Sequence, residues 1–498
     1  MELHSSWQTI RDAPDFIAVP LDENGNPANF ASEVRGLHNS DTWLIVAPAT
    51  ARLNPEFTNV VRQHAATRRD VGIFYADEIE YAGSGANRLR LKPAINLLLL
   101  IADDYIGSPV IVLFSVFTRL GGFRHDARSA GVYDFLLRAV RDGIGIERIP
   151  VVLVAHEGRR PHPTLVDRTA AVNNWIGNSR HIFSLAPGLT DTSLQLHRIF
   201  TSFPDVTLVI PTQQSRQLQV NDASFGKPLI INMLDSLALT DWPMERIKVL
   251  IGDDNPDQSI YADCRYPFDL RRIDTQRAPD APFNYAAKMN TLWRQADSEY
   301  LVLINDDVVV RKSGWLRALM TFAMNEDVAG VGARLLYGNG DLQHAGIPGG
   351  LFGACAHAWI LQPALDETYD DWALVHREWS MVTGAVFATR RTVLELVGGF
   401  DEQFSLEFND VDLCLRMKLL GYKIVYTPFA ELVHFEKASR KDALPRGDQV
   451  ALFLKRWGEL LTNDPAFHPG FDMSSTYIAP RAVRNSWYDA RTASKQAR

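Results

Sequence analysis

An internal repeat is the feature of this sequence that most constrains its fold. The segment GGFRHDARSAGVYDFLLRAVRDGIGIERIPVVLVAHE begins at Gly121, and GGFDEQFSLEFNDVDLCLRMKLLGYKIVYTPFAELVHFE begins at Gly398. After a gap of one residue the two segments run in step, always 278 positions apart, and they match Asp134 with Asp412, Arg138 with Arg416, Gly143 with Gly421, Pro150 with Pro428 and His156 with His434. A repeat of this length predicts two copies of one folding unit.

The length of the chain agrees with this division. At 498 residues it exceeds what one hydrophobic core normally supports, so two main domains and a terminal segment are expected. The boundary between the copies is predicted within residues 188–204. We therefore predict one domain over 1–195, a second over 204–440, and a helical or extended segment over 441–498.

Short apolar runs indicate the type of sheet. Residues 206–211, 247–252 and 299–304 are nearly continuous in apolar side chains and are bounded by Pro, Gly or Asp, which is typical of parallel strands buried on both faces. Helical segments lie between them, for example 286–296. This order predicts an α/β fold: two Rossmann-like domains in tandem, each with a doubly wound, mostly parallel sheet. Such sheets bind ligands at the carboxyl ends of their strands.

Charge and cysteine content exclude some classes of function. The chain has 51 basic and 59 acidic residues, a net charge of -8, which disfavours nucleic acid as a partner. Its three cysteines form no Cys-x-x-Cys pair, so neither a zinc site nor a disulfide framework is expected. The first residues lack a secretion-signal pattern, and the longest apolar run, 95–102, is too short to cross a bilayer. We expect a cytoplasmic protein with at most peripheral contact with the inner face of the membrane.

Polar residues follow the strand expected at 301–304. Asn305, Asp306 and Asp307 supply hard oxygen ligands, which suit Mg²⁺ or Mn²⁺ holding a diphosphate. The same residues would also form an ordinary solvated turn in which an aspartate caps the next helix. The spacing alone leaves both interpretations open.

A second acidic cluster, 407–412, opens the helix of the second repeat. Carboxylates are favoured at a helix N-terminus for electrostatic reasons alone. Asp410 and Asp412 point in different directions, so at most one of them is expected to face a substrate. His434 ends the strand that follows, where a single histidine is more often structural than a ligand. Together, however, these residues could assemble one site for a metal and a diphosphate.

From Val206 to about Phe471 the sequence resembles the family 2 inverting glycosyltransferases of the GT-A fold. The resemblance is to the bacterial, rhamnosyltransferase-like branch that builds surface polysaccharides such as O-antigen. The matching segments occur in the family's order and at its usual spacing: VTLVIPT, FNYAAKMN, EYLVLINDDVVV, LQHAG, MVTGAVFATRR, VGGFDEQF and FNDVDLCLRMKLLGYKIVYTPFAELVHFE.

The resemblance implies a metal site and a place for the donor. Asp307 and His434 match the family's ligands for Mn²⁺ or Mg²⁺, and Asp306 matches a residue near the donor ribose or sugar. Asn305 departs from the family's Asp-x-Asp pattern and is not assigned as a ligand.

The resemblance also implies further donor contacts. Thr212 and Asp253 match positions near the nucleobase and ribose, and Lys288 matches a basic residue near the diphosphate. Without the resemblance, Thr212 and Asp253 would be turn caps, and Lys288 would be a solvated helix charge.

On the acceptor side, Asp410 matches the family's general base, and Asn409 replaces the acid that usually precedes it. Thr383 and Gly384 match residues that shape the acceptor pocket, although Gly384 could serve only to permit close packing. His344 and His357 are interpreted as structural.

The implied function is metal-dependent, inverting transfer of a sugar from a nucleoside-diphosphate donor to a hydroxyl of a glycan or lipid-linked glycan. The competing hypothesis is a non-catalytic scaffold that binds a nucleotide sugar or glycan. A sugar-1-phosphate nucleotidyltransferase would need a Gly-rich, basic phosphate loop, and VIPTQQSR is not one.

The first copy lacks the residues that this chemistry needs. Val132 stands at the position of Asp410, and residues 47–50 offer no carboxylate in place of 305–307. We predict a degenerate GT-A-like domain used for packing, for homo-oligomer formation or for holding a long acceptor.

Overall fold

A computed structural model of the chain describes residues 7–10, 16–27, 41–81, 87–216, 226–276, 282–435 and 446–481. The chain divides into two compact units. The first consists of Met1–Leu196, Pro465–Asp472 and Ala479–Arg498, and the second of His197–Asp464 and Met473–Ile478. The described residues of the predicted terminal segment 441–498 are divided between these units, and Phe453, Trp457 and Phe467 among them are almost inaccessible to solvent.

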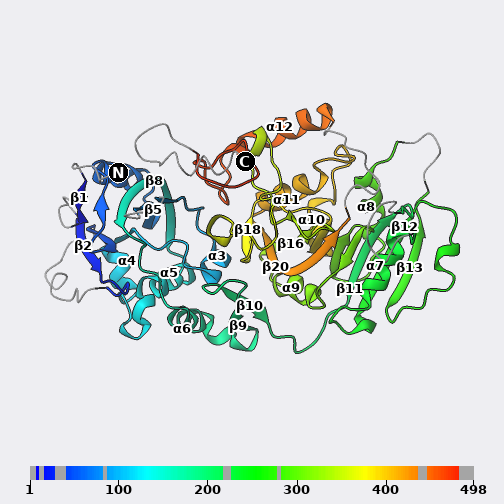
Figure 1. The fold of residues 1–498 in the computed structure, drawn as a ribbon, viewed down its shortest axis with the longest axis horizontal. Helices are drawn as coiled ribbons and strands as arrows, with labels where there is room; N and C mark the ends of the chain where they lie inside the picture. Colours follow the sequence, from blue (N-terminus) through cyan, green and yellow to red (C-terminus); the bar gives the residue numbers. More distant parts are fainter. Residues whose placement is uncertain are drawn as a thin grey trace. The chain divides into compact units, whose positions relative to one another are not determined.

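The first unit is built on a mixed sheet whose strands pair in the order β1-β4-β8-β5-β7-β3-β2, with β6 paired to β5 (Figure 1). Its strands are β1 (Gln8–Thr9), β2 (Phe16–Leu21), β3 (Trp43–Pro48), β4 (Arg52–Leu53), β5 (Val71–Tyr81), β6 (Arg88–Arg90), β7 (Val110–Leu113) and β8 (Gly145–Glu157). The α-helices are α2 (Phe57–Thr67), α3 (Leu97–Ala102), α4 (Phe114–Arg119), α5 (Gly131–Arg141) and α6 (Leu165–Ile176). Strands β9 (Phe183–Pro187) and β10 (Leu194–Arg198) pair separately.

The second unit has a larger sheet in the order β13-β12-β11-β14-β19-β16-β20-β15, with β17 paired to β16 and β18 to β20. Its strands are β11 (Val206–Thr212), β12 (Ile247–Asp253), β13 (Asp269–Asp274), β14 (Tyr300–Ile304), β15 (Val308–Val310), β16 (Val328–Leu336), β17 (Leu342–His344), β18 (Arg377–Trp379), β19 (Val386–Arg390) and β20 (Lys423–His434). The α-helices are α7 (Leu229–Leu237), α8 (Tyr285–Trp293), α9 (Trp315–Ala323), α10 (Arg391–Val397), α11 (Asn409–Leu419) and α12 (Gly447–Thr462).

The two sheets share one pairing plan in the described part of the chain. Strands β2, β3, β7, β5, β8 and β4 pair in the same order and directions as β11, β14, β19, β16, β20 and β15. In both sheets the middle strand, β7 or β19, runs antiparallel to its neighbours, so the sheets are mixed. The prediction of two α/β domains in tandem is confirmed.

Among the described residues, the first sheet has no counterpart of two strands of the second. Between β11 and β14 the chain contains α7, β12, β13 and α8. Between β2 and β3 the described residues 22–27 and 41–42 contain no strand. In this part of the chain the first unit thus has no counterpart of β12 and β13.

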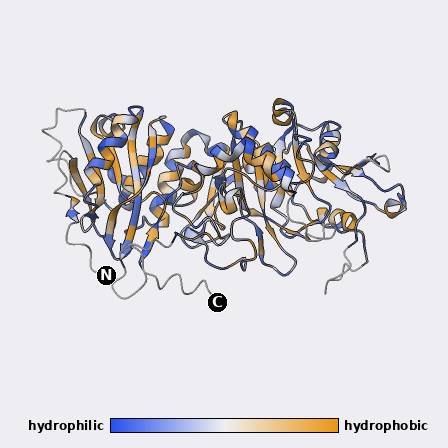
Figure 2. Cartoon of the chain, turned by 90° about the horizontal axis from the view of Figure 1, so that it is seen from above, coloured by the Kyte–Doolittle hydropathy of each residue, from blue (hydrophilic) through white to orange (hydrophobic). Residues whose placement is uncertain are grey.

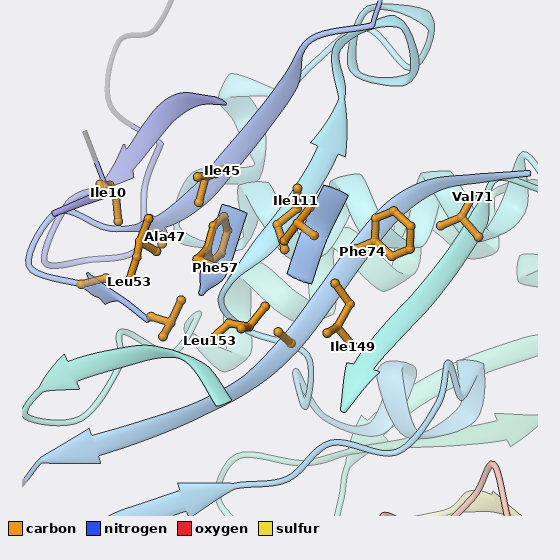
Figure 3. Packing of buried hydrophobic residues seen from close by; sticks show 14 residues of the cluster. Ile10, Ile45, Ala47, Leu53, Phe57, Val71, Phe74, Ile111, Ile149 and Leu153 are labelled. Carbon is orange, nitrogen blue, oxygen red and sulfur yellow. The ribbon is translucent and has the colours of Figure 1, made fainter. Parts of the chain in front are cut away.

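Each unit buries apolar side chains against its sheet. In the first unit, Ile45, Phe74 and Ile111 from the strands belong to one buried cluster, on which Phe57 and Val61 of α2 pack (Figure 3). Figure 2 shows apolar residues along the strands and helices of both units. The buried apolar side chains of the strands agree with the apolar runs that the sequence pattern showed.

The repeat also preserves one polar arrangement. In each copy a glycine pair, Gly121–Gly122 or Gly398–Gly399, precedes the helix, and we call the turn around it the glycine corner. An arginine on the helix binds an aspartate one turn earlier on the same helix and two backbone carbonyl oxygens of the glycine corner. The residues are Arg138 with Asp134, Leu120 and Gly122 in the first unit, and Arg416 with Asp412, Val397 and Gly399 in the second. The matched Asp and Arg residues of the repeat are therefore structural in both copies.

We expect Arg138→Ala to destabilise the first unit by about 3–5 kcal/mol, the usual range when one partner of a buried ion pair is removed. Asp134 is 2% exposed, so its charge would stay buried after the substitution. Hydrogen exchange of the α5 amides measures the free energy of local opening.

Arg141→Ala is the matched control on the same helix. Its side chain is 50% exposed and pairs with a neighbouring surface aspartate, Asp142, so a change within about 0.5 kcal/mol is expected. Equal effects of the two substitutions would contradict the structural role of Arg138.

Candidate active site

A cavity of about 660 Å³ lies where β11 and β14 end, and the start of α11 and the end of β20 also line it. This is the sheet edge at which a ligand was expected. Among the residues that line the cavity are nine of the ten predicted site residues: Thr212, Lys288, Asp306, Asp307, Thr383, Gly384, Asn409, Asp410 and His434. One cavity thus collects residues from distant parts of the sequence.

Sheet pairing brings Asp307 and His434 together. Strand β15 runs antiparallel to β20 with Val308 opposite His434, so Asp307 lies beside the histidine. The His434 Nε2 atom is 3.0 Å from Oδ1 of Asp307. That oxygen is buried and accepts no hydrogen bond from the described residues.

The two neighbouring carboxyl groups differ in pKa. Burial and the charge of Asp307 raise the pKa of Asp306 to about 7, and Thr212 donates a hydrogen bond of 2.5 Å to its Oδ2. Burial alone would raise the pKa of Asp307, but the positive charge of the adjacent His434 holds that pKa below its usual value. The strand end therefore concentrates negative charge in a buried place.

A divalent cation fits this place. A carboxylate and an imidazole are suitable ligands for Mn²⁺, and a buried carboxylate oxygen without a donor is an available ligand atom. In the part of the chain that the structure describes, no three His, Cys, Asp or Glu side chains are grouped to hold a metal ion. Asp307 and His434 would thus leave other coordination positions to phosphate oxygens and water, as is common where a cation binds a diphosphate.

Lys288 lies in the cavity wall next to the end of β11. Its Nζ atom donates to the carbonyl oxygen of Thr212 at 2.8 Å and lies 2.9 Å from Oδ1 of Asp254. Burial lowers the pKa of Lys288, and Asp254 opposes that effect. Lys288 thus presents a positive charge at the cavity wall near Thr212.

Asp253 is the one predicted residue that does not line the cavity. It is 1% exposed and accepts hydrogen bonds from the Tyr261 hydroxyl at 2.7 Å and from Nε2 of Gln214 at 3.0 Å. The neighbouring Asp254 lines the cavity instead. Asp253 ends β12 and Asp254 follows it, so the first carboxylate lies behind the wall of the cavity and the second lines it.

Asp410 enters the cavity from the first turn of α11. Its Oδ2 accepts the backbone N–H of Gly384 at 2.7 Å, and its Oδ1 accepts the N–H of Val411 at 2.8 Å. A Cβ atom on Gly384 would lie 3.0 Å from Cβ of Asp410, so glycine permits this close approach. Asp412 is fully buried and bound to Arg416, which leaves Asp410 as the member of the pair that faces the cavity.

The other acceptor-side residues also shape the loops. Asn409 donates from Nδ2 to the carbonyl oxygen of Leu406 at 2.8 Å. The Thr383 hydroxyl accepts the N–H of Ala385 at 3.3 Å. Both residues line the cavity while holding the backbone around Asp410.

Some cavity residues were not anticipated from the sequence. His357, expected to be structural, lines the cavity, as do Gln343 and Tyr285. His344 is fully buried, in line with a structural role. Tyr285 donates from its hydroxyl to Oδ1 of Asn305 at 3.1 Å. Only the FNYAAKMN and LQHAG segments pointed toward Tyr285 and Gln343, and neither segment indicates what the side chain contacts.

The same positions in the first unit carry different chemistry. In the first unit Arg52 pairs with Ala155, and in the second unit Val309 pairs with Val433. Because Ala155 and Val433 are counterparts in the repeat, Arg52 corresponds to Val309. Thr50 therefore stands at the position of Asp307. Val132 occupies the position of Asp410 and is buried.

His156, the counterpart of His434, contacts a different carboxylate in the first unit. Its Nε2 lies 2.8 Å from Oε2 of the buried Glu78. Lys92 and Arg160 also lie close to Glu78, at 3.4 and 3.3 Å. Side-chain cations thus surround the carboxylate beside this histidine.

Among the helices that the structure describes, none combines the length and apolar character needed to cross a bilayer.

Comparison with known proteins assigns the second unit. Residues 204–446 match the model of the family described as glycosyltransferase like family 2. An uncharacterized protein of Sinorhizobium fredii, y4gI, is 29% identical over 444 residues, covering 84% of this chain and 47% of that protein. The O-antigen biosynthesis protein RfbC of Myxococcus xanthus is 27% identical over 431 residues, covering 82% of this chain and 32% of that protein.

A shorter match is to the N-acetylglucosaminyl-diphospho-decaprenol L-rhamnosyltransferase of Mycobacterium tuberculosis, which is 29% identical over 109 residues, or 22% of this chain and 29% of that protein. The two longer matches cover more of the chain than the second unit could supply by itself, so the similarity extends into the first unit. The chain spans less than half the length of each of these relatives. Residues 204–446 thus match the glycosyltransferase like family 2, and the cavity in this unit is built from the residues that the resemblance singled out.

Proposed function

We propose that the second unit transfers a sugar from a nucleoside-diphosphate donor to a hydroxyl group of a glycan or lipid-linked glycan, with inversion at the anomeric carbon. The observation that carries this proposal is the meeting of three groups in one cavity. These are a pair of cation ligands, a donor-side set of polar residues, and a separate carboxylate on α11.

Asp307 and His434 would hold the cation at the end of β14. A bound Mn²⁺ or Mg²⁺ supplies charge stabilisation for the departing diphosphate. Asp306, fixed by Thr212, faces the donor ribose or sugar, and Lys288 adds a positive charge near the diphosphate.

Asp410 acts as the general base. It takes the proton of the acceptor hydroxyl while that oxygen attacks the anomeric carbon from the face opposite the nucleotide. Each of its carboxylate oxygens accepts one backbone N–H, which orients the group and leaves a lone pair for the proton. Because Asp410 is held apart from the proposed cation ligands, its free oxygen lone pair stays available to the acceptor proton.

The relatives support a role in bacterial surface polysaccharide synthesis. RfbC is named for O-antigen biosynthesis, and the mycobacterial relative is named as a rhamnosyltransferase that acts on a lipid-linked acceptor. An acceptor of that class reaches the cavity beside Thr383, Gly384 and Asn409 in our proposal.

The first unit is proposed to be non-catalytic. It has Thr50 and Val132 where the second unit has Asp307 and Asp410, and it has no counterparts of β12 and β13 among its described residues. Packing, homo-oligomer formation or holding a long acceptor remain its proposed uses.

Asp410→Asn should reduce transfer by about 10²–10⁴-fold, the usual contribution of a general base. The affinity for the donor should change little, because the amide keeps the size of the side chain. A panel of nucleotide sugars with Mn²⁺, read by nucleotide release, identifies the donor and then compares the variants.

Asp263→Asn, at an exposed position outside the cavity, is the control for the same chemical change. Near-normal transfer by Asp410→Asn would rule out the base role. Donor binding without release of nucleotide from any sugar of the panel would favour the non-catalytic scaffold.

Asp307→Asn should abolish the Mn²⁺-dependent part of nucleotide binding, since it removes the anionic ligand. Thr50→Ala changes the equivalent position of the first unit and should leave that binding unchanged. Calorimetric titration with the donor nucleotide, with and without Mn²⁺, makes the comparison. Loss of binding in Thr50→Ala, or its full retention in Asp307→Asn, would contradict the assignment of the site to the second unit.

A further inference from the structure

Gln343 occupies an irregular position beside the cavity. Strand β17 pairs with β16 so that Leu335 lies opposite His344 and Leu336 opposite Leu342, which makes Gln343 the extra residue of a β-bulge. Bulges bend a strand and redirect a side chain, and they are frequent next to active sites. Gln343 is 2% exposed and lines the cavity.

The bulged residue contacts two cavity histidines. Its Oε1 atom lies 2.7 Å from Nδ1 of His434, and its carbonyl oxygen lies 2.9 Å from Nδ1 of His357. An amide oxygen only accepts hydrogen bonds, so Nδ1 of His434 carries a proton and donates it. In the neutral ring, Nε2 then has the lone pair, and this is the atom that faces Asp307 at 3.0 Å.

We propose that Gln343 is a positioning residue that holds His434 in the tautomer and ring orientation needed to bind Mn²⁺ or Mg²⁺ through Nε2. The inference rests on the proposed function, because it requires a cation between His434 and Asp307. When the second ring nitrogen of a ligand histidine donates a hydrogen bond to a buried acceptor, the tautomer and the orientation of the ring are both fixed. Loss of such a partner weakens metal binding.

The first unit provides an internal comparison. Its β6 pairs with β5 in regular register, with Glu78 opposite Arg90 and Glu80 opposite Arg88 and no shift between the pairs. In that unit Thr50 stands where the second unit has Asp307, and His156 contacts Glu78 instead. The shared fold therefore forms without the bulge, and the bulge occurs in the unit that has the candidate cation ligands.

Two substitutions in the full chain separate the role of the acceptor from the role of side-chain volume. Gln343→Met keeps the length of the side chain and removes the acceptor. Gln343→Glu keeps an acceptor and removes the amide donors. The probe is Mn²⁺ alone, followed by the electron paramagnetic resonance of the free ion and by the nitrogen modulation that a coordinated imidazole imposes on the bound ion.

Gln343→Met should weaken Mn²⁺ binding by about 10–100-fold and lose the imidazole nitrogen signal, whereas Gln343→Glu should retain that signal. Gln403→Met, at an exposed glutamine bound to Asp401, should behave like the unsubstituted chain. The nitrogen signal reports coordination itself, so a purely structural role of Gln343 in a chain that stays folded would leave it in place.

An unchanged signal and affinity in Gln343→Met would overturn the inference, as would loss of the signal in Gln343→Glu. If Gln343→Met does not fold, Gln343→Glu alone decides: retention of the signal supports the inference and loss overturns it. If the unsubstituted chain binds Mn²⁺ without a nitrogen signal, the proposed cation site fails and this inference fails with it.

Discussion

The pairing of β15 with β20 is the constraint on which the candidate site depends. It sets Val308 opposite His434 and thereby holds Asp307 beside the imidazole, although the two residues are far apart in the sequence. Every other proposed role is defined relative to this contact. Asp306 lies next to Asp307 between β14 and β15, and the α11 carboxylate of Asp410 stands apart on a helix. A cation at this contact would offset the negative charge that the buried strand end accumulates.

The two units share one pairing plan, and the candidate site residues lie in the second. Their shared strands pair in the same order, and the Asp–Arg brace at the glycine corner is the same in both. Among the described residues the units differ at the edge beyond β2, where the second sheet continues into β12 and β13, and around Glu78, which charged side chains surround. The buried core and the Asp–Arg pair at the glycine corner stabilise the fold, whereas the proposed chemistry uses residues at the strand ends. The residues at the strand ends can therefore differ between the units while the fold stays the same.

Much of this organisation could be predicted from the sequence. The repeat was visible because Asp134, Arg138 and their counterparts make the same structural contacts in both copies. Nine site residues converge in one cavity because strand ends and helix starts of a wound sheet meet at one edge. The opposite orientations of Asp410 and Asp412 followed from helix geometry alone.

Other features depended on register, which local sequence does not specify. The direction of β19 was not evident, since a short apolar run reads the same in a parallel or antiparallel strand. Which of Asp253 and Asp254 faces the cavity depends on the phase of β12. The contacts of Gln343 arise from a bulge against β16, a strand whose pairing no short motif encodes.

A crystal structure of the chain with Mn²⁺ and its donor nucleotide, with anomalous data collected at the manganese edge, would test where the cation and the diphosphate bind. We predict one strong peak between Asp307 and His434, in contact with the diphosphate, with the Asp410 carboxylate outside the coordination sphere. A peak in the first unit, or a manganese ion bound by Asp410, would contradict the proposed division between cation ligands and base.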